Sequence, residues 1–214
     1  MNNQNIISYN INGRKIPSFY ENPIDNQIII LCDYFISSCK KYKITPNCIT
    51  IIRIFISFYI IYILYFSSYI FIPIYGIALF YFMDCLDGHL ARLTNQVTIL
   101  GDYLDHNADL FFYINFLIYI LYKSYKYKFY IIIEFIIFSY LALIHLSLQQ
   151  QNYKIIIYNS NQKLENFNIE DCEILDNLKY LHNFKPNNIK WSKYFGTGTL
   201  YLNILLIIFW IKYN

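Results

Sequence analysis

The chain has 214 residues, of which 57% are hydrophobic and 14% charged, and its formal net charge is +3. A soluble domain is about 25% charged, so this chain has too little charge to cover a water-facing surface, and it is far too hydrophobic to be intrinsically disordered. So small a net charge on an apolar chain does not indicate nucleic-acid binding, and the composition predicts a membrane protein.

The chain begins with a polar segment followed by a short apolar one. Residues 1–26 lack a basic start followed by an apolar core, so they do not resemble a secretory signal peptide. Residues 27–38 are apolar over about ten positions, too few to cross a hydrocarbon core about 30 Å thick. Three lysines follow before residue 44. We expect an interfacial amphipathic helix over 27–44, with a helix buried beneath the bundle as the alternative.

Residues 45–214 are interpreted as one membrane domain. Five mostly apolar stretches of about 20 residues are each long enough to cross a bilayer. They cover 49–70, 71–90, 99–122, 129–148 and 191–211. The polar stretch over 150–190 is expected to be an extramembrane loop with a short helix near 173–182. The sequence therefore predicts an all-α polytopic membrane bundle of about five to six transmembrane helices.

Two further features of these stretches guide the topology. The three lysines before residue 44 and Arg53 crowd the start of the first span, so the positive-inside tendency places the N-terminus in the cytoplasm. The second span then ends, and the third begins, on the cytoplasmic side. Gln149, Gln150 and Gln151 are interpreted as an ordinary exit of the fourth span at the membrane surface.

Carboxylates gather at the end of the second span and the start of the third. An ionised Asp in the middle of a membrane helix costs about 2.5–3.5 kcal/mol. Asp84 and Asp87 share one helical stripe with Gly88 and Ala91, because these positions follow i, i+3, i+4 and i+7. The two small residues would let a flat ligand approach the helix backbone beside the carboxylates.

The next helix carries a second stripe of this kind. Gly101, Asp105 and Asp109 are spaced by four residues. If the two stripes face each other, four carboxylates converge without another evident charge partner. Such a cluster predicts two divalent cations, and oxygen ligands without cysteine favour Mg²⁺ or Mn²⁺ over Zn²⁺. Arg92 lies at the edge of the same site, where it could contact a phosphate.

Together these residues form the pattern D-x2-D-G-x2-A-R-x8-G-x3-D-x3-D between Asp84 and Asp109. The pattern resembles the signature of the CDP-alcohol phosphotransferase (phosphatidyltransferase) family. Upstream, the segment P-N-C-I-T at 46–50, with Arg53, is similar to the segment that opens the family's first span. The resemblance covers about 23–122.

The resemblance implies a reaction. A CDP-linked donor (CDP-diacylglycerol, CDP-ethanolamine or CDP-choline) would transfer its phosphoalcohol group to an acceptor hydroxyl, with release of CMP. By position, the metal ligands would be Asp84, Asp87, Asp105 and Asp109. Asp109 would also accept the proton of the acceptor. The resemblance further implies a homodimer. For a eukaryotic protein we expect the endoplasmic reticulum or another endomembrane, and the positive-inside tendency puts the active site on the cytoplasmic side.

Other roles follow from the same resemblance. The substrate-binding residues would be Gly88, Ala91, Arg92 and Gly101. Gly88 and Ala91 would make room for the cytidine, and Arg92 would hold a phosphate. His106 would either hydrogen-bond a metal-bound carboxylate or be an ordinary interfacial histidine. His89 points away from the Asp stripe, so we expect it to be polar surface.

The sequence leaves open the identity of the acceptor and two competing classes of membrane protein. Leu110 stands where family members that use a phosphorylated alcohol often carry Lys or Arg, which favours free inositol or a diacylglycerol hydroxyl as the acceptor. The sequence does not decide between an inositol-type and an ethanolamine- or choline-type enzyme. The alternatives are an intramembrane prenyltransferase that uses a Mg-diphosphate, and a cation-binding membrane transporter.

Overall fold

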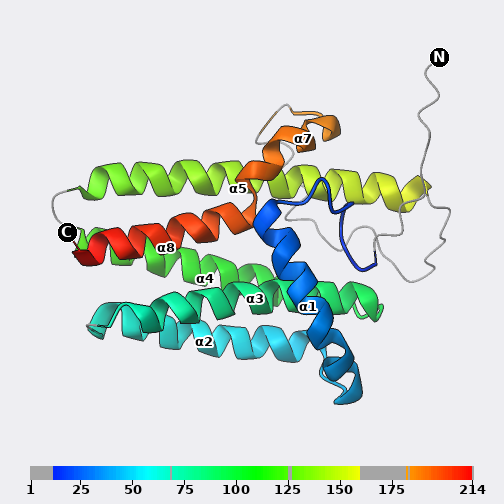
Figure 1. Cartoon of the computed structure of the whole chain (residues 1–214), viewed down its shortest axis with the longest axis horizontal. Coiled ribbons are helices and arrows are strands. Elements are labelled where there is room, and N and C mark those ends of the chain that lie inside the picture. Colours follow the sequence, from blue (N-terminus) through cyan, green and yellow to red (C-terminus); the bar gives the residue numbers. More distant parts are fainter. Residues whose placement is uncertain (1–11, 68, 125–126, 160–181, 183, 214) are drawn as a thin grey trace.

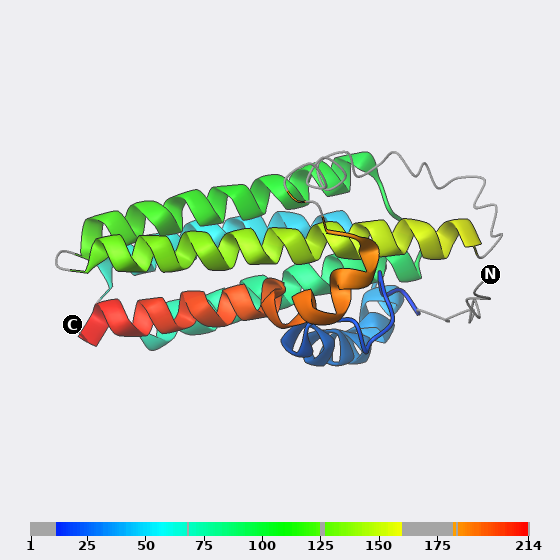
Figure 2. The same cartoon turned by 90° about the horizontal axis from the view of Figure 1, so that it is seen from above.

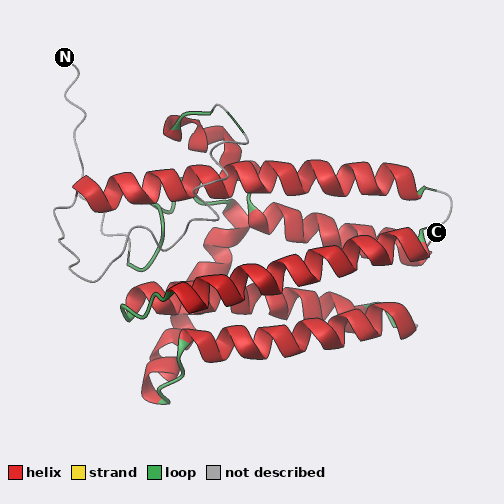
Figure 3. Ribbon diagram, turned by 180° about the vertical axis from the view of Figure 1, so that it is seen from behind, coloured by secondary structure: helices red, strands yellow, loops and turns green. Residues whose placement is uncertain are grey.

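The computed structural model describes residues 12–67, 69–124, 127–159, 182 and 184–213. Within these residues every regular element is a helix, as Figure 3 shows, so the predicted all-α fold is confirmed. In chain order the helices are α1 (Pro23–Lys41), α2 (Pro46–Phe66), α3 (Phe71–Leu93), α4 (Ile99–Lys123), α5 (Lys128–Asn159), η2 (Pro186–Asn188), α7 (Ile189–Ser192), η3 (Lys193–Phe195) and α8 (Thr197–Tyr213).

The long helices α2, α3, α4, α5 and α8 run side by side and form a bundle (Figures 1 and 2). Consecutive members run in opposite directions. Four helical segments of the described chain are long and apolar enough to cross a membrane, namely Pro46–Phe66, Phe71–Leu93, Phe129–Ile156 and Pro186–Tyr213. The protein is therefore a polytopic membrane protein, as the sequence predicted.

Helix α4 corresponds to the predicted span over 99–122, but it is not among those four segments. Its first half carries Asp102, Asp105 and Asp109, which make it less apolar than its neighbours. Its second half is apolar and packs into the core of the bundle. The first half of α4 is only partly buried, since Asp102, Asp105 and Asp109 are of intermediate exposure, and in Figure 2 the helix lies along one edge of the bundle.

The bundle core consists of apolar side chains from all five long helices. Phe80 of α3 stacks on Phe112 of α4, with ring centroids 4.9 Å apart. Gly76 of α3 allows α2 to approach closely, because a Cβ at that position would lie 2.8 Å from Cγ1 of Ile60. These contacts fix α2, α3 and α4 relative to one another, and these three helices carry the site.

Helix α1 crosses the bundle at an angle (Figure 1). The Asn22 side chain caps it by accepting hydrogen bonds from the backbone N–H groups of Ile24 and Asp25, at 2.9 and 3.4 Å. One side of α1 packs against α3 through Ile29, Cys32, Ile36 and Cys39. The other side exposes apolar side chains, including Leu31 (45% exposed) and Phe35 (47% exposed). Such a distribution is typical of a helix at a membrane surface, and the interfacial position of α1 stays a prediction.

Helix α5 is longer than predicted. We expected the fourth span to end at 148 and a loop to start at 150, but the helix continues to Asn159. Glutamine is a good helix former, and neither Gly nor Pro interrupts 149–159, so the polar composition does not end the helix. The interpretation of Gln149 and Gln150 as a surface exit is wrong, since both are buried. Most of the expected loop, and the short helix expected near 173–182, lie outside the described residues.

The N-terminal segment packs on the bundle over its described part. Ile16 is fully buried and clusters with Ile144 and Leu148 of α5 and Ile189 of α7. At the end of the segment, the Asn22 amide donates a hydrogen bond of 2.7 Å to a backbone carbonyl of η3. These contacts bring residues 12–22 to the same end of the bundle as the predicted site.

Candidate active site

A cavity of about 910 Å³ lies between α1, α2, α3, α4, α5 and α8. The residues that the sequence singled out for metal and substrate binding all line it, namely Asp84, Asp87, Gly88, Ala91, Arg92, Gly101, Asp105, His106 and Asp109. A tight turn joins the two helices that supply them, with Asn95 in the left-handed conformation at φ 54°. Thr98 then caps α4 by accepting a 3.0 Å hydrogen bond from the Gly101 N–H.

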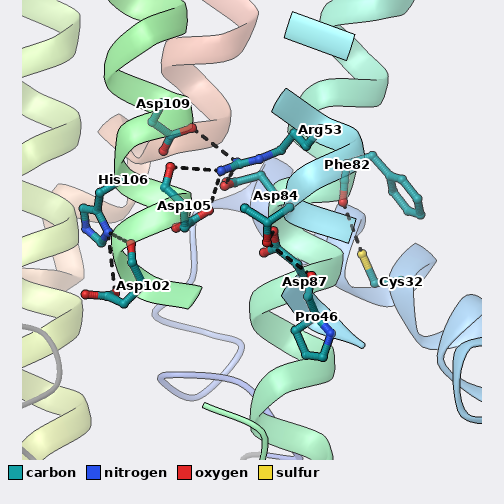
Figure 4. Close-up of polar contacts among 11 residues, drawn as sticks. Cys32, Pro46, Arg53, Phe82, Asp84, Asp87, Asp102, Asp105, His106 and Asp109 are labelled. Atoms are coloured by element: carbon teal, nitrogen blue, oxygen red, sulfur yellow. Dashed lines mark hydrogen bonds and ion pairs between the residues drawn. The ribbon is translucent and has the colours of Figure 1, made fainter. Parts of the chain in front are cut away.

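Three of the four predicted metal ligands converge. Asp84 of α3 and Asp105 and Asp109 of α4 each offer a carboxylate oxygen, and these oxygens lie within 4.8 Å of one another. Figure 4 shows the three side chains pointing toward a common centre. The two helical stripes therefore face each other, as expected from the spacing.

Arg53 of α2 occupies the centre of this cluster (Figure 4). Its Nη1 donates to the carboxylates of Asp84 and Asp109, the latter at 3.3 Å. Its Nη2 donates to the Asp105 carboxylate at 2.5 Å. The guanidinium is fully buried and lies over the Phe80 ring, with Cζ 4.9 Å from the ring centroid. One arginine thus joins three helices through three carboxylates.

This arrangement corrects two expectations. We expected the carboxylates to lack a charge partner within the chain, but Arg53 provides one. We also counted Arg53 among the basic residues at the membrane surface, whereas its side chain is 0% exposed. The sequence contains a signal for the inward position of Arg53. The residue lies seven positions after Pro46 on α2 and one turn after Thr50, on the same side of the helix.

Asp87 lies outside the converging group and has a different partner. The Thr50 hydroxyl of α2 donates a hydrogen bond of 2.7 Å to its carboxylate. Asp87 is buried, yet it lines the same cavity as the other three carboxylates. The structure therefore brings three of the predicted ligands together and holds the fourth beside them, against α2.

The predicted phosphate-binding arginine lies over its own helix. Gly88 leaves room for it, because a Cβ there would lie 3.1 Å from Nη1 of Arg92. The Arg92 Nε donates a hydrogen bond of 2.5 Å to the backbone carbonyl of Gly13 in the N-terminal segment. Ala91 completes the small-residue surface on this side of the cavity.

Gly101 is needed for a close contact between α4 and the start of α2. A Cβ on Gly101 would lie 2.7 Å from Oδ1 of Asn47 and 3.0 Å from the hydroxyl of Thr98. All three residues line the cavity. Gly101 therefore allows α4 to approach the start of α2 closely where both helices line the cavity.

The two histidines near the motif behave differently from each other. His106 Nδ1 lies 2.8 Å from the Asp102 carbonyl oxygen and 3.5 Å from the Asp102 carboxylate, so both contacts lie outside the converging carboxylates. His89 is buried, with Nε2 2.7 Å from the Asp33 carboxylate on α1 and Nδ1 3.3 Å from the Gly13 carbonyl. Our expectation of polar surface at His89 is therefore wrong, and it joins α1 to α3.

The donor set suits a hard divalent cation. Asp84, Asp105, Asp109 and the neighbouring Asp87 supply only oxygen ligands. The Arg53 guanidinium carries one positive charge against the three carboxylates that it contacts. The model that describes the CDP-alcohol phosphatidyltransferase family matches residues 43–168, more than half of the chain.

The chain belongs to the CDP-alcohol phosphatidyltransferase family. The family transfers a phosphoalcohol group from a CDP-alcohol to an alcohol acceptor, takes part in phospholipid biosynthesis and generally uses a divalent metal. No curated protein and no solved structure matches the chain. The match confirms the family predicted from the Asp pattern, and it gives no support to the prenyltransferase or transporter alternatives.

Proposed function

We propose that this protein is a Mg²⁺- or Mn²⁺-dependent enzyme that transfers a phosphoalcohol from CDP-diacylglycerol, CDP-ethanolamine or CDP-choline to an acceptor hydroxyl and releases CMP. The observation that carries this proposal is the convergence of Asp84, Asp105 and Asp109 in a cavity that also holds Arg92. The complete pattern from Asp84 to Asp109 lies inside the matched part of the chain.

Asp84, Asp87, Asp105 and Asp109 are the residues that would hold two divalent cations. Bound cations would neutralise charge on the diphosphate and align the nucleophile with the leaving group. The chain's own contribution is to hold the carboxylates at fixed positions. Arg53 contacts Asp84, Asp105 and Asp109, and Thr50 holds Asp87 against α2.

Asp109 is our candidate for the group that accepts the proton of the acceptor hydroxyl. It lies one turn deeper along α4 than Asp105 and lines the same cavity. There its carboxylate can face both the converging oxygens and an incoming alcohol. Gly88, Ala91 and Gly101 leave space beside it for the nucleotide, and Arg92 would bind a phosphate oxygen.

The proposed setting is an endomembrane such as the endoplasmic reticulum, with a homodimer whose active sites face the cytoplasm. The positive-inside tendency of the first span supports this orientation, because α3 ends and α4 begins on the side where α2 starts. The dimer rests on the family alone. Light scattering of the active protein in mild detergent tests it, and an active monomer would contradict it.

The function is tested with membranes that contain the protein and radiolabelled CDP-diacylglycerol, CDP-ethanolamine or CDP-choline. Each donor is combined with inositol, glycerol phosphate, serine or diacylglycerol, and CMP release is measured. We expect one donor and acceptor pair to give CMP and a labelled lipid product. Binding of metal without CMP release from any donor would contradict the proposal and favour a cation-binding role.

A further inference from the structure

The N-terminal segment contributes to the cavity in a way that the Asp motif does not explain. Lys15 lines the cavity, although it lies outside residues 43–168, the part of the chain that matches the family. Two residues earlier, the backbone carbonyl of Gly13 accepts the hydrogen bond from Arg92. The segment therefore brings a cation of its own to the cavity and also contacts the cation that the motif supplies.

The chain is anchored on both sides of Lys15. Before it, Gly13 contacts the end of α3, and Arg14 Nη1 donates a hydrogen bond of 2.9 Å to the Asn26 side chain on α1. After it, Ile16 is fully buried in a cluster with side chains of α5 and α7. Lys15 is therefore held at a defined place beside three helices.

Gly13 is required for the close passage of this segment over α3. Its φ is 75°, in the left-handed region that favours glycine. A Cβ on Gly13 would lie 2.5 Å from Cγ of Leu93. The Gly13 carbonyl oxygen also lies 3.3 Å from Nδ1 of the buried His89. The position of this carbonyl is therefore set by packing against α3.

The contact with Gly13 orients the Arg92 guanidinium. The carbonyl uses only Nε, while Nη1 lies over the bare backbone of Gly88. Among the described residues, neither terminal nitrogen of Arg92 donates a hydrogen bond. A guanidinium held in this way keeps the planar pair of donors that binds a phosphate group through two hydrogen bonds.

Lys15 belongs to the same neighbourhood as Arg92. Two residues span at most about 7 Å, so the Cα of Lys15 lies within that distance of the Cα of Gly13. Lys15 and Arg92 also both act electrostatically on Glu21. A lysine there could simply balance the charge of Glu21. However, neither cation forms an ion pair with a carboxylate of the described residues, which favours an external anion as the partner.

We infer that Lys15 is a second phosphate-binding residue of the cavity, which binds a phosphate group of a substrate together with Arg92, and that Gly13 is a positioning residue for Arg92. This inference rests on the proposed function. The phosphate is carried either by the nucleotide of the donor or by a phosphorylated acceptor. Both present the same anionic oxygens to a lysine, which acts as a point charge beside the fork of donors of Arg92.

The experiment compares Lys15→Met with Arg14→Met and Lys15→Arg in the full chain. Arg14 is a matched control because it is the neighbouring residue, carries the same charge, also acts on Glu21 and does not line the cavity. Calorimetry in Mg²⁺ measures the binding of CDP and, separately, of glycerol 3-phosphate. Thermal unfolding establishes that each variant is folded, and CMP release gives KM and kcat.

We expect Lys15→Met to weaken the binding of one of the two probes by about 5- to 20-fold, the equivalent of one lost charge-assisted contact. The probe that is affected identifies the source of the phosphate. The loss should shrink at high salt concentration, because mobile ions screen a point charge. Lys15→Arg should retain most of the affinity, Arg14→Met should stay within about twofold of wild type, and kcat should change little in all three.

The role of Gly13 is tested with Gly13→Ala, alone and combined with Arg92→Met. We expect Gly13→Ala to weaken the binding of the same probe, because the added Cβ moves the carbonyl away from Arg92. If Gly13 acts through Arg92, the additional loss from Gly13→Ala should be much smaller in the Arg92→Met background. Equal losses in both backgrounds would overturn the positioning role.

Three results would overturn the role of Lys15. These are unchanged binding of both probes in folded Lys15→Met, equal losses in Lys15→Met and Arg14→Met, and absence of binding of both probes to wild type. Any of them can occur while wild type still releases CMP, so the proposed function would stand. Absence of CMP release with every donor would instead overturn the proposed function, whereas the binding measurements need no turnover.

Discussion

Arg53 of α2 donates to Asp105 of α4 twice, at 2.5 Å to the carboxylate and at 3.1 Å to the backbone carbonyl. Because the guanidinium donates to both the side chain and the main chain of Asp105, it fixes the position of that turn of α4. It also fixes the direction of the Asp105 carboxylate. A permanent cation, the Arg53 guanidinium, therefore assembles the three carboxylates in this structure.

Arg53→Met should make folding depend on a divalent cation. Removing one partner of a buried ion pair typically costs about 3–5 kcal/mol, because the remaining charges stay buried and unpaired. We expect the variant to unfold at a clearly lower temperature than wild type in excess chelator, and to recover much of the difference in Mg²⁺. Arg53→Lys, which keeps the charge but not the fork of donors, should be intermediate. Equal unfolding temperatures of Arg53→Met and wild type in chelator would contradict this role.

Activity should require Mg²⁺ or Mn²⁺ and be lost in Asp84→Asn, because an amide oxygen cannot supply the charge that binds the cation. CMP release measured in Mg²⁺, Mn²⁺ and excess chelator tests this. Asp33→Asn is the control, since Asp33 lies on α1 with a side chain 57% exposed and does not line the cavity. Full activity in excess chelator would show that the carboxylate cluster does not act through a metal.

Asp109→Asn should abolish turnover but largely preserve donor binding. A positioned general base contributes about 10²–10⁴-fold to the rate, so a loss of that size is expected. Asp87→Asn should weaken donor binding as well, because it removes a proposed metal ligand beneath the diphosphate. Calorimetry of donor binding in Mg²⁺, paired with CMP release, separates the two. Equal loss of donor binding in both variants would reassign Asp109 as a metal ligand only.

Glu21 should make stability depend on pH. Burial raises the pKa of Glu21 from 4.5 to about 7, and nearby Asp25 adds to the rise, while Arg14, Arg92 and Lys15 oppose it. The folded protein thus keeps a proton that the unfolded chain releases, so stability falls as pH rises from about 4.5 to about 7. A shift of this size amounts to on the order of 3 kcal/mol.

Glu21→Gln removes the titrating group and should flatten this dependence. The measurement is the thermal unfolding temperature at pH 5 and pH 8 in the same detergent. We expect the unfolding temperature to fall less between pH 5 and pH 8 in the variant than in wild type. An identical loss would show that Glu21 does not control the pH dependence.

The helices and the Asp motif could be predicted because their signals are local. Apolar runs of about 20 residues mark the spans, and a four-residue spacing puts Asp105 and Asp109 on one side of α4 whatever its neighbours are. Their convergence with Asp84 followed from the short connection between α3 and α4. These features need no knowledge of how distant helices pack.

The role of Arg53 and the burial of Gln150 could not be predicted in the same way, because both depend on packing between segments far apart in sequence. A basic residue near the start of a span is more often at the membrane surface, and only the register of α2 against α4 turns Arg53 inward. Similarly, consecutive glutamines after an apolar run suggest an exit to water. Only the continuation of α5 to Asn159 and the packing of the N-terminal segment bury Gln150.

The length of α5 has a consequence for how substrates arrive. At 1.5 Å per residue, its 32 residues extend about 48 Å, well beyond a hydrocarbon core of about 30 Å. Its final turns therefore stand above the lipid tails at the end of the bundle where the Asp motif lies. In the proposed reaction, the polar nucleotide of the donor would enter from the headgroup layer alongside these turns, while a lipid reactant stays in the bilayer. The overhanging helix would then set the depth at which a polar and an apolar reactant meet.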